Sequence, residues 1–280
     1  RSPEPTASPP SELVAETPAM QRAVTLARRA AGSISTILLT GESGTGKSAL
    51  ARMIHEASPR ASGPFGQLNC AALPAGLVEA ELFGVRRGAF TDAREDRAGL
   101  FARARGGTLF LDEIGDMALE VQPKLLLTLE SGTFRPVGGD EELPHDVRLV
   151  AATNRVPERA VSEGHLRADL FHRLNVIRIE VPPLRERLAD IPPLVDQLLE
   201  RASARTGREI LGVTEPAMRW LCAQPWDGNV RELANVIERA VTLTEHDALV
   251  LEDFATGPAA EPSDVAFLQR AAAQNVDLAE

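Results

Sequence analysis

The sequence contains no tyrosine, and aromatic residues make up only 4% of its 280 residues. Only two of its 30 cationic side chains are lysines, Lys47 and Lys124, and the other 28 are arginines. Apolar residues (44%) and charged residues (25%) are present in the proportions of an ordinary globular protein. The scarcity of aromatic residues therefore does not exclude a packed core, and a chain of this length can bury a full-sized one.

Cysteine is equally scarce. Cys70 and Cys222 are the only two, they lie far apart, and neither stands in Cys-x-x-Cys or Cys/His spacing. This excludes a disulfide framework and a cysteine-based zinc site. We expect both thiols to fill core space in a reduced, cytoplasmic chain.

Long apolar runs and an excess of basic charge are also missing. No apolar run approaches the roughly 20 residues that a membrane helix needs, so we expect no membrane partner. The net charge is −10 and the isoelectric point is near 5.1, which argues against nucleic-acid binding by this stretch itself. Any DNA contact is expected from a domain absent from this chain.

Apolar patterning divides the chain into an α/β region and a helical region. Apolar or β-branched runs predict strands near residues 34–40, 65–68, 108–111, 147–152 and 175–181. Helical spacing between them predicts a parallel sheet with helices on both faces. Beyond the double prolines at 182–183 and 192–193 the pattern is helical only. We therefore predict a linker over 1–17, an α/β subdomain over 18–184, a small helical subdomain over 185–254 and a tail over 255–280.

A phosphate-binding loop stands between the first predicted strand and the helix after it. Its sequence is Gly-Glu-Ser-Gly-Thr-Gly-Lys-Ser, residues 41–48. Glycines there let backbone N–H groups turn onto phosphates at a helix N-terminus, Lys47 suits the β- and γ-phosphates, and the Ser48 hydroxyl suits Mg²⁺. We expect ATP and Mg²⁺ as cofactors, with the nucleotide bound by Gly41, Glu42, Ser43, Gly44, Thr45, Gly46, Lys47, Ser48 and Ala49.

Two acids end the predicted strand near 108–111. Asp112 is placed to hold magnesium together with Ser48, and Glu113 to orient and polarise the attacking water. Two adjacent acids alone also fit a solvated turn. The phosphate loop upstream favours the catalytic interpretation and predicts a Mg²⁺-dependent ATPase.

With these motifs the sequence resembles the AAA+ ATPase domain of bacterial enhancer-binding proteins, the sigma-54-dependent transcription activators. The resemblance runs from about Leu13 to Leu251 and implies a P-loop ATPase sheet followed by a helical lid. Its landmarks, in order, are residues 41–48, 68–73, 88–93, 106–116, 151–154, 167–173, 182–187 and 226–233.

The resemblance implies roles that spacing alone does not give. Asn69 is expected to hold Glu113 in an inactive pose, and Thr153 and Asn154 to sense the γ-phosphate. Arg167 and Arg173 are expected as arginine fingers that reach the ATP of a neighbouring subunit, where guanidinium groups neutralise developing charge. A homo-hexamer or heptamer ring is therefore implied. Arg231 is expected to project from the lid onto the nucleotide.

The resemblance also implies a contact with the sigma-54 RNA polymerase holoenzyme through residues Gly88, Ala89, Phe90, Thr91, Asp92 and Ala93. The family's usual form has glycine where this chain has Asp92, which adds charge and removes a permissive backbone position. Two functions follow. The first is a ring ATPase that remodels sigma-54 polymerase and drives open-complex formation. The second is an AAA+ regulator that uses ATP for oligomerisation without remodelling sigma-54.

Overall fold

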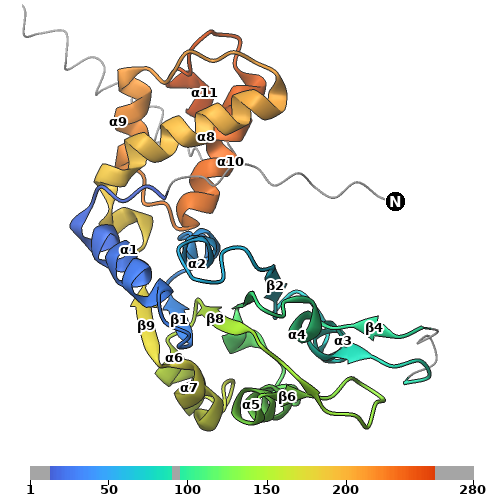
Figure 1. The fold of residues 1–280 in the computed structure, drawn as a ribbon. Coiled ribbons are helices and arrows are strands. Elements are labelled where there is room, and N and C mark those ends of the chain that lie inside the picture. Colours follow the sequence, from blue (N-terminus) through green and yellow to red (C-terminus); the bar gives the residue numbers. More distant parts are fainter. Residues whose placement is uncertain (1–12, 90–94, 256–280) are drawn as a thin grey trace, which may run out of the picture. The chain divides into compact units, whose positions relative to one another are not determined.

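The structure, a computed structural model, describes residues 13–89 and 95–255 (Figure 1). The chain splits into two compact units, one ending at Arg187 and the other beginning at Leu188. The predicted boundary lay three residues earlier. Arg187 belongs with the first unit because its side chain is buried there and donates a hydrogen bond to the Thr45 carbonyl oxygen.

A five-stranded parallel sheet forms the centre of the first unit, with the strand order β2-β5-β8-β1-β9. Its strands are β1 (Ile37–Thr40), β2 (Phe65–Asn69), β5 (Thr108–Asp112), β8 (Arg148–Thr153) and β9 (Ile177–Glu180). Because every strand runs the same way, the loops that follow them emerge at one edge. The phosphate loop and Glu113 both follow strands, so the sheet brings them to that edge.

Alternate side chains of the central strands enter two different cores. Leu109 and Leu111 of β5 belong to one core, and Phe110 between them belongs to the other. Leu38 of β1 is likewise separated from Ile37 and Leu39. Side chains alternate across a strand, so a sheet buried on both faces needs continuous apolar runs. This explains why the central strands β1, β5 and β8 are apolar over most of their length.

Helices cover both faces of the sheet (Figure 1). One face is covered by α1 (Pro18–Ala31) and α2 (Lys47–Glu56), which supply Met20, Ala27, Leu50 and Ile54 to their core. The helices of the other face are α3 (Ala75–Phe83), α4 (Leu100–Arg103), α5 (Gln122–Ser131), α6 (Pro157–Ser162) and α7 (Ala168–Leu174). The double covering confirms the predicted fold class.

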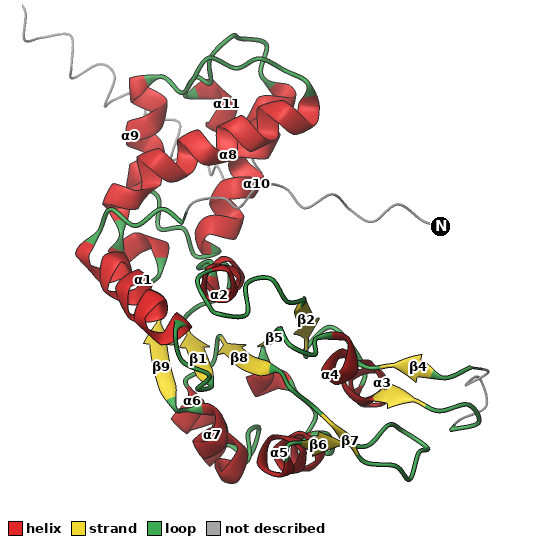
Figure 2. Ribbon diagram, in the orientation of Figure 1, coloured by secondary structure: helices red, strands yellow, loops and turns green. Residues whose placement is uncertain are grey.

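Two short antiparallel hairpins leave this unit side by side (Figure 2). One pairs β3 (Gly84–Val85) with β4 (Arg97–Ala98), and the other pairs β6 (Thr133–Phe134) with β7 (Leu143–Pro144). A bridge between Val85 and Val137 joins them. At their bases the ring of Phe101 lies 5.6 Å from that of Phe83 and 5.9 Å from that of Phe134. An aromatic-poor chain thus places three of its rings here.

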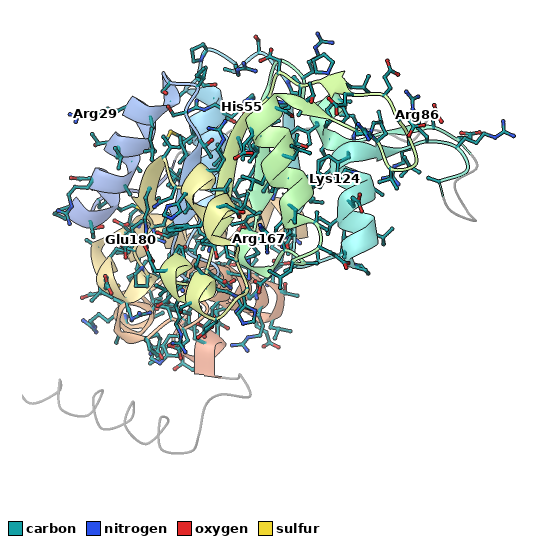
Figure 3. The ribbon with its side chains drawn as sticks, turned by 90° about the horizontal axis from the view of Figure 1, so that it is seen from below. Arg29, His55, Arg86, Lys124, Arg167 and Glu180 are labelled. Carbon is teal, nitrogen blue, oxygen red and sulfur yellow. The ribbon has the colours of Figure 1, made fainter. Side chains whose placement is uncertain are left out.

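The Arg86 side chain adds a polar tie between the hairpins, far out on the stem (Figure 3). Its guanidinium lies 2.6 Å from the Asp96 carboxylate on its own hairpin and 3.5 Å from the Glu141 carboxylate on the other. All three side chains are well exposed, so each pair contributes little stability by itself.

The second unit is helical. It contains α8 (Ile191–Thr206), α9 (Glu215–Ala223), α10 (Asn229–Leu243) and α11 (Glu252–Ala255), after the 3₁₀ turn η3 (Leu188–Asp190). Its interior is built from one apolar face of each long helix, including Val195, Leu221 and Ile237. No helix in the described ranges is long and apolar enough to span a bilayer.

Arg148, at the start of β8, is a buried cation that supports the first unit. Its guanidinium donates to the carbonyl oxygens of Ala30 and Ala31, each at 2.6 Å, where α1 ends. Burial lowers its pKa from the usual value. We predict that Arg148→Met lowers the free energy of unfolding of this unit by about 2 kcal/mol, because two buried carbonyls lose a charged donor. Urea unfolding followed by far-ultraviolet circular dichroism measures the change.

Arg22→Met is the control for this prediction, since Arg22 is exposed on the same helix. It should change the free energy of unfolding by less than about 0.5 kcal/mol. Both tryptophans lie in the second unit, so their fluorescence follows that unit separately. An unshifted circular dichroism transition in Arg148→Met would contradict the prediction.

Candidate active site

The phosphate loop joins β1 to α2 and depends on three glycines with positive φ. Gly41, Gly44 and Gly46 have φ values of 145°, 79° and 102°, a region that other residues enter only with strain. At Gly41 a Cβ atom would also lie 2.4 Å from the Val181 carbonyl oxygen. Gly46 is the N-cap of α2. The loop is therefore shaped so that backbone N–H groups and a helix N-terminus can receive an anion.

Lys47 is the buried cation of this loop, with only 6% of its surface exposed. Its Nζ donates to the carbonyl oxygens of Gly41 and Glu42, at 2.8 and 2.9 Å. The side chain thus folds back along the loop whose residues would surround the phosphates. A compact ammonium suits this place, where one point charge with several donors is needed.

Ser48 and Asp112 bring two oxygen donors together from different elements. The Ser48 hydroxyl, in the first turn of α2, lies 3.4 Å from the Asp112 carboxylate at the end of β5. Hydroxyl and carboxylate oxygens are the ligands that Mg²⁺ prefers, and Mg²⁺ usually takes few protein ligands beside phosphate and water. No cluster of three or more His, Cys, Asp or Glu suited to a metal occurs within residues 13–89 and 95–255. The residues present fit magnesium.

Glu113 occupies a strained position beside this pair. Its φ and ψ are 52° and 49°, in the left-handed region, which costs a non-glycine residue free energy and often marks a functional site. Its carboxylate accepts a hydrogen bond from the Asn154 backbone N–H at 3.0 Å. Burial raises the pKa of Glu113, while the nearby Lys47 charge opposes the rise. A raised pKa suits a carboxylate that takes a proton from water.

Residues at the end of β8, the strand beside β5, contact Glu113 and the turn that follows it. Thr153 is buried, and Asn154 supplies the N–H that holds Glu113. Arg155 then binds Asp116 through two guanidinium nitrogens, at 2.9 and 2.5 Å. Asp116 ends the 3₁₀ turn η1 (Ile114–Asp116), so the turn after Glu113 is tied to β8. Sequence reasoning missed this pair, because one more arginine in an arginine-rich chain gives no signal.

Asn69 lies at the end of β2, opposite Asp112 in the strand register. Its side-chain oxygen accepts the Ala71 N–H at 2.9 Å and caps the turn after the strand. The Glu113 carboxylate is held by Asn154 in this structure. The switching role of Asn69 toward Glu113 stays a prediction.

Arg167 and Arg173 frame α7. The Arg167 guanidinium binds the Asp169 carboxylate, with its shorter contact at 2.7 Å, and Arg173 donates to the Leu129 carbonyl oxygen at 2.7 Å. Both contacts are solvent-exposed. Their partners, Asp169 and Leu129, lie outside the phosphate loop and away in sequence from Asp112 and Glu113. Figure 3 labels Arg167, the residue that precedes α7.

Gly88, with φ 82°, and Ala89 continue the β3 stem, whereas Phe90, Thr91, Asp92 and Ala93 lie outside the described residues. Arg231 lies in the first turn of α10, in the second unit. Its role toward the nucleotide stays a prediction.

The parallel sheet, the phosphate loop and the acids of β5 define a P-loop nucleotide-binding domain of the AAA+ class, with a helical lid as the second unit. Residues 13–180 match the sigma-54 interaction domain family, and residues 185–266 match the AAA+ ATPase lid domain. The chain belongs to the sigma-54 interaction domain family.

Curated relatives are regulatory proteins of bacteria. The Nif-specific regulatory protein of Azotobacter vinelandii is 51% identical over 241 residues, covering 86% of this chain and 46% of the relative. The regulatory protein AtoC of Escherichia coli K12 is 47% identical, covering 86% and 52%. The transcriptional regulator NtrC of Proteus hauseri is 45% identical, covering 87% and 51%. The chain thus spans about half the length of the curated relatives it matches.

Solved structures give the same fold. NtrX from Brucella abortus in complex with ADP superposes with a TM-score of 0.80 at 34% identity, covering 94% of this chain and 61% of that one. NtrX in complex with ATP superposes with a TM-score of 0.80 at 37% identity, covering 92% and 60%.

The raised pKa of Glu113 predicts how its substitution changes stability with pH. Because the pKa is higher in the folded chain, the folded state binds the proton more tightly, and stability falls as pH rises through that pKa. Glu113→Gln removes this ionisation and keeps an oxygen for the Asn154 N–H. We expect the variant to be more stable than wild type at pH 7, with the difference vanishing below about pH 4, the range of unfolded glutamate.

Chemical unfolding at pH 4 and pH 7 measures this difference. Glu120→Gln is the matched control, because Glu120 is exposed on the same connection between η1 and α5. Its stability should differ from wild type by the same small amount at both pH values. A Glu113→Gln variant less stable than wild type at pH 7 would contradict the prediction.

Proposed function

We propose that this chain is a Mg²⁺-dependent ATPase whose hydrolysis cycle remodels sigma-54 RNA polymerase and drives promoter opening. The observation that carries the proposal is the convergence of Lys47, Ser48, Asp112 and Glu113 at one edge of the sheet. Membership of the sigma-54 interaction domain family supports the polymerase as the target. The nucleotide complexes of NtrX support ATP as the ligand.

Each residue of the site has one task in this mechanism. The loop's N–H groups and Lys47 bind the phosphates, and Ser48 and Asp112 hold the magnesium ion, which supplies neutralising charge when bound. Glu113 orients the attacking water and accepts its proton. Thr153 and Asn154 sense the γ-phosphate from β8, and a change at Asn154 is transmitted to Glu113 through their hydrogen bond.

Arg167 and Arg173 act on the ATP of a neighbouring subunit. Their exposure on α7, with partners outside the phosphate loop, fits groups that serve a different copy of the chain. A guanidinium delivered across the interface stabilises the charge that develops on the transferring phosphoryl group. Such a site is complete only in a closed ring, so the active form is a homo-hexamer or heptamer.

The hairpin of β3 and β4 transmits the conformational change of the ATPase cycle to sigma-54. It carries Gly88 to Ala93, which contact sigma-54 in this proposal, with Phe90 as the contacting aromatic. The β6–β7 hairpin beside it supports the stem through Val137 and Glu141. In this proposal the assembly acts in the cytoplasm, and DNA contact is made only through a domain absent from this chain.

Glu113→Gln and Phe90→Ala separate hydrolysis from its use. We expect Glu113→Gln to bind ATP but hydrolyse it at least about 100-fold more slowly, since a general base contributes that factor or more. Phe90→Ala should keep ATPase activity and lose open-complex formation. Phosphate release and open-complex formation on a pre-melted promoter, with sigma-54 polymerase, measure the two effects.

Glu120→Gln should match wild type in both assays. If the wild type hydrolyses ATP but neither forms open complexes nor binds sigma-54 with a transition-state analogue, the remodelling function fails. The alternative then holds, in which ATP supports oligomerisation only, and Asp92 is the feature that favours it. If the wild type does not hydrolyse ATP, the enzymatic proposal fails as well.

Mixing two inactive variants tests action between subunits. Arg173→Ala keeps its own phosphate loop, and Lys47→Ala keeps its own arginines. If the arginines act in trans, a mixture contains active sites that combine an intact loop with an intact finger. We expect each variant alone to lose at least about 100-fold in ATPase rate, and an equimolar mixture to recover a substantial part of it. A mixture as inactive as its components would overturn the trans arrangement.

A further inference from the structure

The outer side of the phosphate loop is lined by the segment that follows β9. Three successive points of this segment meet three points of the loop. The Val181 carbonyl oxygen lies 2.4 Å from the place where a Cβ of Gly41 would be, and Arg185 binds Glu42 through two nitrogens, at 2.8 and 2.6 Å. Arg187 donates from Nη2 to the Thr45 carbonyl oxygen at 2.6 Å.

Arg187 differs from Arg185 in burial. The Arg185–Glu42 pair is exposed by 44% and 42%, so it is screened and contributes little to holding the loop. Arg187 is among the largest fully buried side chains of the chain. A buried guanidinium is retained only where hydrogen bonds compensate its desolvation, and a charged donor to a carbonyl is stronger than a neutral one.

The acceptor of this bond belongs to a peptide group of the phosphate loop itself. The Thr45 carbonyl and the Gly46 N–H are the two ends of one peptide group. Gly46 is the N-cap of α2, with φ 102°, and no atom lies within 4 Å of the place where its Cβ would be. A cation on the carbonyl polarises the group and strengthens the N–H as a donor.

We propose that Arg187 is a positioning residue for nucleotide binding. From outside the loop it fixes the Thr45–Gly46 peptide with its N–H toward the phosphates and strengthens that donor. The residue is also the last of the first unit, so its hydrogen bond fastens the end of that unit to the unit's own phosphate loop. This inference rests on the proposed ATPase function.

Arg187→Met, which removes the donor and keeps an apolar stem, tests the inference. Because the Gly46 N–H acts in the ground state and the transition state alike, its loss should raise KM and leave kcat little changed. We expect KM for ATP and Kd for ADP to rise about tenfold, with kcat at saturating ATP within about threefold of wild type. Arg187→Lys keeps a charged donor and should recover part of the affinity.

Arg148→Met is the matched control. Arg148 is also a buried arginine that donates to backbone carbonyls, but at the end of α1. It should lower the melting temperature and leave KM and the Kd for ADP unchanged. An unchanged Kd for ADP in Arg187→Met, or the same rise in Arg148→Met, would overturn the positioning role.

If Arg187→Met does not fold, Arg187→Lys decides: a Kd for ADP raised several-fold at normal melting supports the inference, and an unchanged Kd overturns it. Failure of the underlying function looks different, because the wild-type chain itself would then bind no ADP.

Discussion

The register of three adjacent parallel strands determines where every reacting group lies. Thr40 of β1 pairs with Thr153 of β8, and Ala151 of β8 pairs with Leu111 of β5. The phosphate loop, Thr153 and the two acids therefore lie at nearly the same level of the sheet. A shift of one residue would turn each strand's side chains to the opposite face. The two cores, which take alternate residues of the same strands, prevent that shift.

Apolar patterning predicted the main elements because their signals are strong. The five sheet strands occur where apolar runs indicated them, and α8, α9 and α10 lie in the region where the pattern was helical only. The predictions missed both hairpins, β3–β4 and β6–β7, and helices α4, α6 and α7. A strand of two residues has no measurable period, and short helices such as α6, with six residues, carry too few buried positions to show one.

The residues of the site also fall into those that the sequence could predict and those that it could not. Lys47, Ser48, Asp112 and Glu113 could be predicted because glycine spacing and strand-end acids imply their chemistry. Arg155 and Arg187 could not, since their importance comes from the chain segments that the fold brings beside them. The contact of Glu113 with the Asn154 backbone is also invisible in sequence, because every residue except proline supplies a backbone N–H. Composition gives one general clue. Arginine is the common cation here, and a planar, weakly hydrated guanidinium can be buried against carbonyls, as Arg148 and Arg187 are.

The aromatic stack at the base of the hairpins has a mechanical consequence. Phe83 ends α3, Phe101 lies in α4 and Phe134 in β6, so one packed group of rings joins the roots of both hairpins. Close-packed rings change their separation very little, because packed interiors have low compressibility. Rotation of α3 at this root therefore turns both stems together, and the displacement grows with distance from the rings. We therefore expect the two hairpins to move together as one rigid body about the packed phenylalanines, with the largest displacement farthest from these rings.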